Sequence, residues 1–203
     1  MEDIINYVEN KTDLPDKPVL ITADDGFYNN YYYLLPLLEK YDMKATISVV
    51  GYYSEVLAEN DPHVPQYSYL TWEDIKQCID SGRIEIGNHT YDMHSISERK
   101  GCSKLEYESE EEYEKIFLDD IGVMQTTVKM NTGITPVVFA YPYGCISPES
   151  IPLLKKIGFS AALTCFEKPN YITHDKNCLF SINRYNRPAG MSTEEFMKKL
   201  LSH

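Results

Sequence analysis

The sequence predicts an α/β protein of repeating strand–helix units, in which a parallel sheet or barrel is flanked by helices. Short, almost wholly apolar runs alternate with stretches of helical pattern along the 203 residues. Such runs are typical of strands that are buried on both faces of a parallel sheet. No Gly-, Ser- or Pro-rich linker divides the chain. We therefore expect one domain over residues 1–203.

Six strands are expected, and three of them run directly into polar or turn-forming residues. In a fold of repeating strand–helix units, active groups lie at the C-terminal ends of the strands. These three strand ends are therefore where a functional site is expected. The predicted strands cover residues 19–23, 45–50, 84–87, 137–140, 160–164 and 179–183.

Helices are expected between the strands, and their ends carry local signals. The longest should run from Glu110 to Met130 and end at Gly133. The other signals are capping boxes at Thr71/Asp74 and Ser192/Glu195, an N-cap at Ser147 followed by Pro148, and Pro36 in the first turn of a helix over 34–41.

Composition excludes several classes of function. Nineteen basic and 31 acidic residues give a net charge of −12, which disfavours a nucleic-acid partner. No apolar run is long enough to span a membrane, and the N-terminus lacks the features of a signal peptide. The five cysteines form no CxxC pair, so a thiolate zinc site is not expected and a reducing compartment is favoured. By sequence we expect a cytoplasmic protein.

The first unusual strand end carries two adjacent carboxylates, Asp24 and Asp25, followed by Gly26. Neighbouring residues of a strand point in opposite directions. Both carboxylates therefore face one site only if the strand breaks there, which Gly26 allows. A turn capped by one aspartate is the alternative.

The other two strand ends carry imidazoles and a rigid bend. His89 and His94 follow the third strand, and imidazole is the commonest metal-binding side chain. One carboxylate with two imidazoles is a familiar open metal site. Pro142 and Gly144 force a bend after the fourth strand, where Tyr143 could present its backbone N–H to a cleft.

Taken together, Asp-Asp-Gly, then His-Thr-x-x-x-His, then Tyr-Pro-Tyr-Gly resembles the polysaccharide deacetylase family (carbohydrate esterase family 4, the NodB-homology domain). The resemblance extends from about Leu14 to about Met197. It is nearest to the branch that contains the poly-N-acetylglucosamine deacetylases, because the two histidines are five residues apart. It implies a distorted, incomplete (β/α) barrel with a metal at its C-terminal mouth.

The resemblance also implies roles for individual residues. Asp24 is expected to be the general base, and the backbone N–H of Tyr143 the oxyanion donor. The expected metal ligands are Asp25, His89 and His94, which would hold one divalent ion. Zinc is the first choice, with cobalt, nickel or manganese as alternatives.

Two departures from the family pattern bear on activity. Ala140 replaces the arginine that normally steadies the base, and Arg184 is the candidate to replace it from the last strand. The general acid is missing, because neither a histidine upstream of Asp24 nor a late Leu-His-Asp is present. His174, in a polar loop, is a weak candidate for the general acid. Otherwise the chain uses another proton donor, or it is a truncated or weakened member of the family.

The function expected from the resemblance is metal-dependent removal of N-acetyl groups from an N-acetylglucosamine-containing polysaccharide or oligosaccharide. The partner is therefore a carbohydrate substrate. Two alternatives stay open: a degenerate carbohydrate-binding member with little turnover, and an acetyl ester (xylan-type) esterase. A metallophosphatase is disfavoured because no basic phosphate clamp accompanies the motifs. Family members often act at the cell envelope, whereas this sequence shows no export signal.

Overall fold

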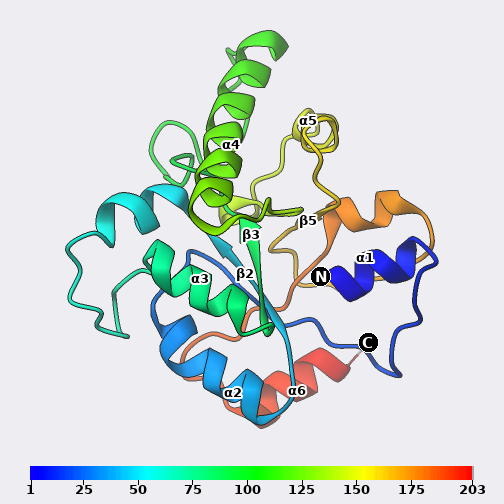
Figure 1. Cartoon of the computed structure of the whole chain (residues 1–203). Coiled ribbons are helices and arrows are strands. Elements are labelled where there is room, and N and C mark those ends of the chain that lie inside the picture. Colours follow the sequence, from blue (N-terminus) through cyan, green and yellow to red (C-terminus); the bar gives the residue numbers. More distant parts are fainter. Residues whose placement is uncertain (203) are drawn as a thin grey trace.

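A computed structural model describes residues 1–202 as five parallel strands in the order β1-β2-β3-β4-β5, surrounded by helices (Figure 1). Every neighbouring pair of strands is parallel, as the repeating strand–helix pattern predicts. The strands are β1 (Thr22–Ala23), β2 (Ala45–Val49), β3 (Ile84–Asn88), β4 (Val138–Ala140) and β5 (Ala161–Leu163).

The predicted sixth strand, over residues 179–183, is wrong. Residues Lys176–Ser181 form a 3-10 helix, η4, and only Ile182 forms an isolated parallel bridge, with Leu163 of β5. A short apolar run cannot by itself distinguish a strand from a buried helical turn, and Leu179 and Phe180 are buried from η4. The barrel is therefore incomplete on the side of β5.

The helices begin and end largely where their sequence signals predict. Thr71 and Asp74, Ser109 and Glu112, and Ser192 and Glu195 each form a reciprocal capping box. The helices are α1 (Glu2–Val8), α2 (Leu35–Lys40), α3 (Trp72–Asp80), α4 (Glu110–Thr132), α5 (Ser150–Lys156) and α6 (Thr193–Leu201), with shorter helical segments η1 (Asn30–Leu34), η2 (Tyr53–Leu57) and η3 (Pro142–Gly144).

The N-cap expected at Ser147 is wrong. Helix α5 begins at Ser150, with Glu149 as the residue before it. The Ser147 hydroxyl instead accepts a hydrogen bond from the backbone N–H of Lys104, at 2.7 Å. A contact 43 residues away in the sequence thus takes the acceptor that a local cap would use.

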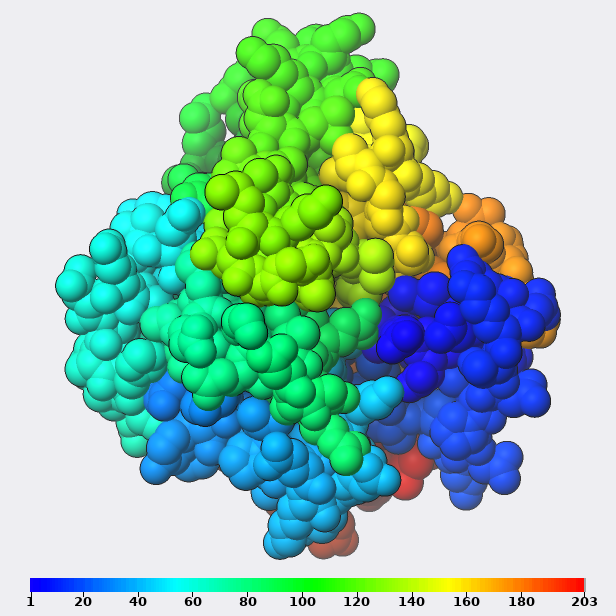
Figure 2. Space-filling model, viewed as in Figure 1, coloured from blue at the N-terminus to red at the C-terminus, as the bar shows by residue number. Residues whose placement is uncertain are grey.

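Helix α4 holds the two halves of the core together. Its buried residues recur every three or four positions, which places them on one face of the helix. Tyr113, Phe117 and Ile121 belong to the apolar cluster around β4 and β5, whereas Met124 and Val128 belong to the cluster around β2 and β3. Figure 2 shows α3, α4 and α5 side by side over this face of the molecule. No helix in the described residues 1–202 is long and apolar enough to cross a membrane.

We expect Phe117→Ala to lower the free energy of unfolding by about 3–5 kcal/mol, because it removes a fully buried ring from this helix and leaves a cavity. Urea unfolding followed by circular dichroism measures the change. Ile116→Ala, at a neighbouring position that is 41% exposed, is the control and should cost less than about 1 kcal/mol. Equal losses in the two variants would contradict the packing described for α4.

Candidate active site

The three unusual strand ends meet at one edge of the sheet. Asp25 follows β1, His89 follows β3, and Tyr143 follows β4. The strands are parallel and consecutive, so their C-terminal ends lie on the same side. Chain order and sheet order coincide, and this brings together residues more than 100 positions apart.

Asp25, His89 and His94 form a compact cluster. Their nearest ligand-type atoms all lie within 4.8 Å of one another. Asp25 Oδ1 lies 3.4 Å from His89 Nε2 and 3.1 Å from His94 Nε2. A carboxylate oxygen and two imidazole nitrogens that face the same point are a donor set that divalent transition metals accept. These three residues could therefore hold such an ion.

A tight turn lets Asp24 and Asp25 face the same site. Strand β1 ends at Ala23, and both Asp25 and Gly26 adopt the left-handed conformation, with φ of 70° and 77°. At Gly26 a Cβ atom would lie 2.9 Å from Val49 Cγ1, so a side chain there would clash with β2. The strand thus breaks at the two aspartates, as their orientation requires, and the left-handed turn includes Asp25 as well as Gly26.

The second nitrogen of each imidazole is also engaged. His89 Nδ1 lies 2.7 Å from the carbonyl oxygen of Ala140. Because a carbonyl only accepts hydrogen bonds, Nδ1 carries a proton, and this contact fixes the ring so that Nε2 faces Asp25. His94 Nδ1 lies 3.1 Å from the Tyr53 hydroxyl and 3.2 Å from that of Tyr143. Both rings are thus oriented by their surroundings before any ligand binds.

Electrostatics favour an ionised Asp25. Burial alone would raise the pKa of this carboxyl group, but hydrogen bonds and charge from His89 and His94 outweigh burial and hold the pKa well below its usual range. Burial raises the pKa of the neighbouring Tyr53 to about 12. At neutral pH the cluster therefore presents a carboxylate beside a protonated phenol.

Asp24 and Arg184 form a two-pronged ion pair beside the cluster. Arg184 Nη1 and Nη2 donate to the two carboxylate oxygens of Asp24, each at 2.7 Å, and Arg184 Nε donates to the carbonyl of Thr164 at 2.7 Å. Such paired hydrogen bonds fix orientation as well as charge. Burial would lower the pKa of Arg184, yet Asp24 raises it overall. Arg184 thus reaches the position where the sequence analysis placed it.

Tyr143 has a strained backbone in the expected bend. It adopts φ 57° and ψ 12° between Pro142 and Gly144. A left-handed non-glycine residue is uncommon and clusters at functional sites. Its ring also packs against His94, with centroids 4.8 Å apart. The role of its N–H as an oxyanion donor stays a prediction.

With this geometry described, comparison with known proteins identifies the family. The sequence matches the family model described as polysaccharide deacetylase over residues 11–162, more than half of the chain. The chain belongs to the polysaccharide deacetylase family.

Relatives and solved structures agree with this assignment. The poly-beta-1,6-N-acetyl-D-glucosamine N-deacetylase of Escherichia coli (strain K12) is 27% identical over 171 residues, covering 74% of this chain and 25% of that protein. The structure of IcaB from Ammonifex degensii has a TM-score of 0.75 at 26% identity, covering 96% of this chain and 76% of that chain. The BpsB deacetylase domain from Bordetella bronchiseptica has a TM-score of 0.77 at 25% identity, covering 91% and 76%. The expected distorted, incomplete barrel of the polysaccharide deacetylase type is confirmed. The chain spans about a quarter to about half of the length of the curated relatives it matches.

Tyr141, Leu163 and His174 make structural contacts in this polysaccharide deacetylase fold. Tyr141, the first residue of the Tyr-Pro-Tyr-Gly motif, and Leu163 of β5 are fully buried members of the core. The Tyr141 hydroxyl contacts Ser150 of α5 at 2.8 Å. His174 lies against α1, where its Nδ1 is 3.1 Å from the Tyr7 carbonyl oxygen. His174 is therefore not placed beside Asp25.

Sequence reasoning missed Tyr53 as part of the site. It lies in η2, just after β2, so it too follows a strand end. Its hydroxyl contacts His94, and its ring packs against Tyr69 with centroids 4.5 Å apart. Tyr53 carries no motif of its own. Tyr53 follows β2, and the C-terminal end of β2 lies between those of β1 and β3. This position after a strand end is the signal that could have identified Tyr53.

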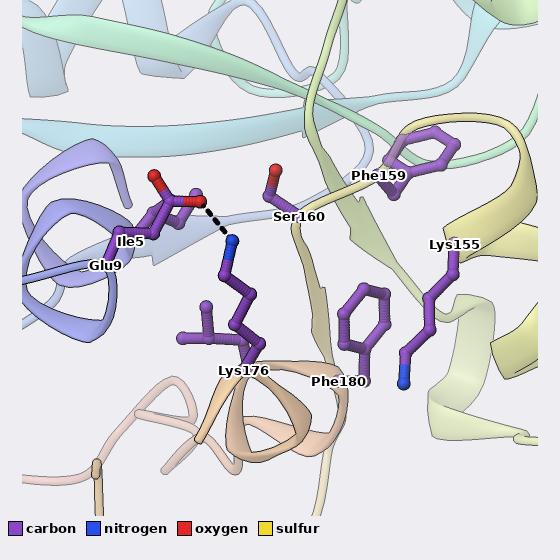
Figure 3. Close-up of a pocket in the computed structure, with 8 residues that line it drawn as sticks. Ile5, Glu9, Lys155, Phe159, Ser160, Lys176 and Phe180 are labelled. Atoms are coloured by element: carbon purple, nitrogen blue, oxygen red, sulfur yellow. Dashed lines mark hydrogen bonds and ion pairs between the residues drawn. The ribbon is translucent and has the colours of Figure 1, made fainter. Parts of the chain in front are cut away.

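A separate pocket lies away from these strand ends. It has a volume of about 260 Å³ and lies between α1, η4 and the residues that precede β5 (Figure 3). Lys176 donates to Glu9 there at 2.9 Å, while Lys155 lies over the ring of Phe180. Ser160, which also lines the pocket, immediately precedes β5. The pocket is therefore at the N-terminal side of the sheet, opposite to the Asp25 cluster.

Proposed function

We propose that this protein is a metal-dependent hydrolase that removes N-acetyl groups from an N-acetylglucosamine-containing polysaccharide or oligosaccharide. The observation that carries the proposal is the Asp25–His89–His94 cluster beside the Asp24–Arg184 pair, within a fold of this family. The similarity to poly-beta-1,6-N-acetyl-D-glucosamine N-deacetylases supports an amino-sugar polymer as the substrate.

The donor set fits one divalent cation held by Asp25, His89 and His94. We propose zinc, with cobalt, nickel and manganese compatible with the same ligands. A bound ion of this kind supplies Lewis acidity that lowers the pKa of water and polarises a carbonyl group. The chain would contribute the Asp25 carboxylate and the Nε2 atoms of His89 and His94, which face it.

Asp24 is proposed as the general base. Its side chain is 26% exposed, so a water molecule reaches the carboxylate, which accepts the proton as water attacks the acetamide carbonyl. Arg184 holds both oxygens of Asp24 and fixes the orientation of the carboxylate. The Tyr143 N–H would donate to the tetrahedral oxygen, and the loss of one such donor typically costs about 10²–10³ in rate.

The leaving amine needs a proton donor, and no further histidine in the described part of the chain is placed to supply the proton. Within the described residues 1–202, the histidines other than His89 and His94 are His63, which contacts Asp74, and His174, which lies against α1. Neither is placed in the cluster. This observation keeps the two alternatives, a weakly active carbohydrate-binding member and an acetyl ester esterase.

Acetate release tests the proposal directly. Purified protein is assayed for bound metal and then incubated with β-1,6-linked N-acetylglucosamine oligomers, with and without a chelator. We expect chelator-sensitive acetate release that returns when zinc or cobalt is added. A protein that binds metal and oligomer but releases no acetate would support the binding alternative.

Because no further histidine of the described residues 1–202 lies in the cluster, we predict a preference for esters. A well-placed acid contributes about 10²–10⁴ in rate, and the alcohol of an activated ester leaves with less help than an amine. We therefore expect metal-dependent turnover of an activated acetyl ester to exceed that of the oligomers by about this factor. Amide cleavage as fast as ester cleavage would reveal an acid within the chain. Ester cleavage that a chelator leaves unchanged would contradict the metal mechanism.

A further inference from the structure

His94 lies on a loop rather than on a strand or helix, so its position needs an explanation. His89 directly follows β3, and its backbone N–H donates to the Val49 carbonyl at 3.0 Å. His94 lies five residues further along, beyond Thr90, which has a left-handed φ of 74°. The sheet alone therefore does not place the second imidazole opposite Asp25.

A carboxylate from the long helix holds this loop. Asp120 of α4 accepts hydrogen bonds from two consecutive backbone N–H groups: that of Tyr91 to Oδ1 and that of Asp92 to Oδ2, both at 2.8 Å. Burial raises the pKa of the Asp120 carboxyl group, and the backbone N–H groups of residues 91–93 act against this rise. Successive N–H groups after a left-handed residue form a concave site for an anion, and Asp120 fills it.

The helix that carries Asp120 is a rigid support. Its neighbours Phe117, Ile121 and Met124 are fully buried in the core. Gln125, on the same helix, accepts a hydrogen bond from Asn88 at 3.3 Å, and Asn88 in turn accepts from the Thr90 N–H at 2.8 Å. Helix α4 thus fixes both the start of the loop and its middle.

We propose that Asp120 is a positioning residue for the metal centre: by binding the backbone N–H groups of Tyr91 and Asp92 it places the His94 imidazole opposite Asp25. The inference rests on the proposed metal site. Residues that orient metal ligands typically change metal affinity by about 10–100-fold when they are replaced. Asp120 acts on the ligand through the peptide backbone, with no need to contact the imidazole.

Asp120→Asn tests this assignment without a change in size. An amide has one oxygen and directs an NH₂ group at the second backbone donor, so at least one of the two hydrogen bonds is lost. Asp119→Asn, at the exposed neighbouring position of the same helix, is the matched control for the loss of one negative charge. Asp120→Glu keeps the carboxylate and serves as the conservative variant.

Metal affinity, measured by competition with a chromophoric chelator, and the visible spectrum of the cobalt-loaded protein are the readouts. Asp120→Asn should bind zinc about 10–100-fold more weakly than the parent and show an altered cobalt spectrum. Asp119→Asn should match the parent, and Asp120→Glu should lie between the parent and Asp120→Asn. Thermal unfolding of the metal-free proteins reports any change in fold stability separately.

Unchanged zinc affinity and an unchanged cobalt spectrum in Asp120→Asn would overturn the inference while leaving the proposed function intact, even if the metal-free variant were less stable. An equal loss of affinity in Asp119→Asn would overturn it as well, because charge rather than position would then be responsible. A parent protein that bound no metal would overturn both the inference and the proposed metal site. If Asp120→Asn fails to fold, parent-like affinity in Asp120→Glu, whose longer side chain displaces the carboxylate, would count against positioning.

Discussion

Asp24→Asn is expected to lower kcat for acetate release by about 10²–10⁴ while metal content stays at the parent level. The amide cannot accept a proton from water, but the Asp25 cluster is left in place. Asp25→Asn should behave differently and lose bound metal together with activity, because one of the three proposed ligands is replaced by a weaker, neutral oxygen. Metal analysis and acetate release on the same preparations measure both effects.

The two variants are each other's control, since they differ by one position and make the same chemical change. The roles assigned here would be contradicted if Asp24→Asn lost metal while Asp25→Asn kept it. Parent-like hydrolysis by Asp24→Asn would show that another group takes the proton.

Arg184→Gln is expected to lower kcat by about 10²-fold, with metal content unchanged and KM little affected. Glutamine cannot make the paired contact with Asp24, and a base displaced by about 1 Å can cost this factor. Arg184→Lys should fall between glutamine and the parent, because lysine keeps the charge but not the planar fork.

Arg187→Gln is the matched control for this prediction. Arg187 is exposed and contacts Met191 and Thr193 rather than Asp24. It should keep parent kinetics. If both arginine variants lost activity equally, a general effect of charge on the acidic protein would explain the result, and the pairing with Asp24 would not.

The sequence predicted the candidate site better than it predicted the elements beside it. Asp25 and His89 follow apolar strands, and parallel pairing brings such strand ends together wherever the strands' exact limits fall. The position of His94 was predicted from the family resemblance. The loop that carries it is hydrogen-bonded to Asp120, 26 residues further along the chain, and a carboxylate on a helix has no local signal that identifies such a contact.

Where the sequence analysis was wrong, a distant contact replaced a local one. Ser147 carries an N-cap signal, but its hydroxyl binds the backbone of Lys104. Leu179, Phe180 and Ile182 are apolar because they are buried in the core. A strand at this place would bury apolar residues in the same way. Local patterns record that a residue is buried, not which neighbour buries it.

The open side of the barrel has a consequence for local unfolding. Backbone hydrogen bonds at Thr164 and Ile182 extend the sheet beyond β5. From there Arg184 reaches across to Thr22 and Asp24, at the end of β1. The Arg184 side chain thus links the two margins of the sheet, whereas in a closed barrel backbone hydrogen bonds between strands would join them. Any fluctuation that separates these margins also releases the proposed base, so hydrogen exchange at Thr164 and Ile182 reports how often the protein visits a state without an oriented carboxylate.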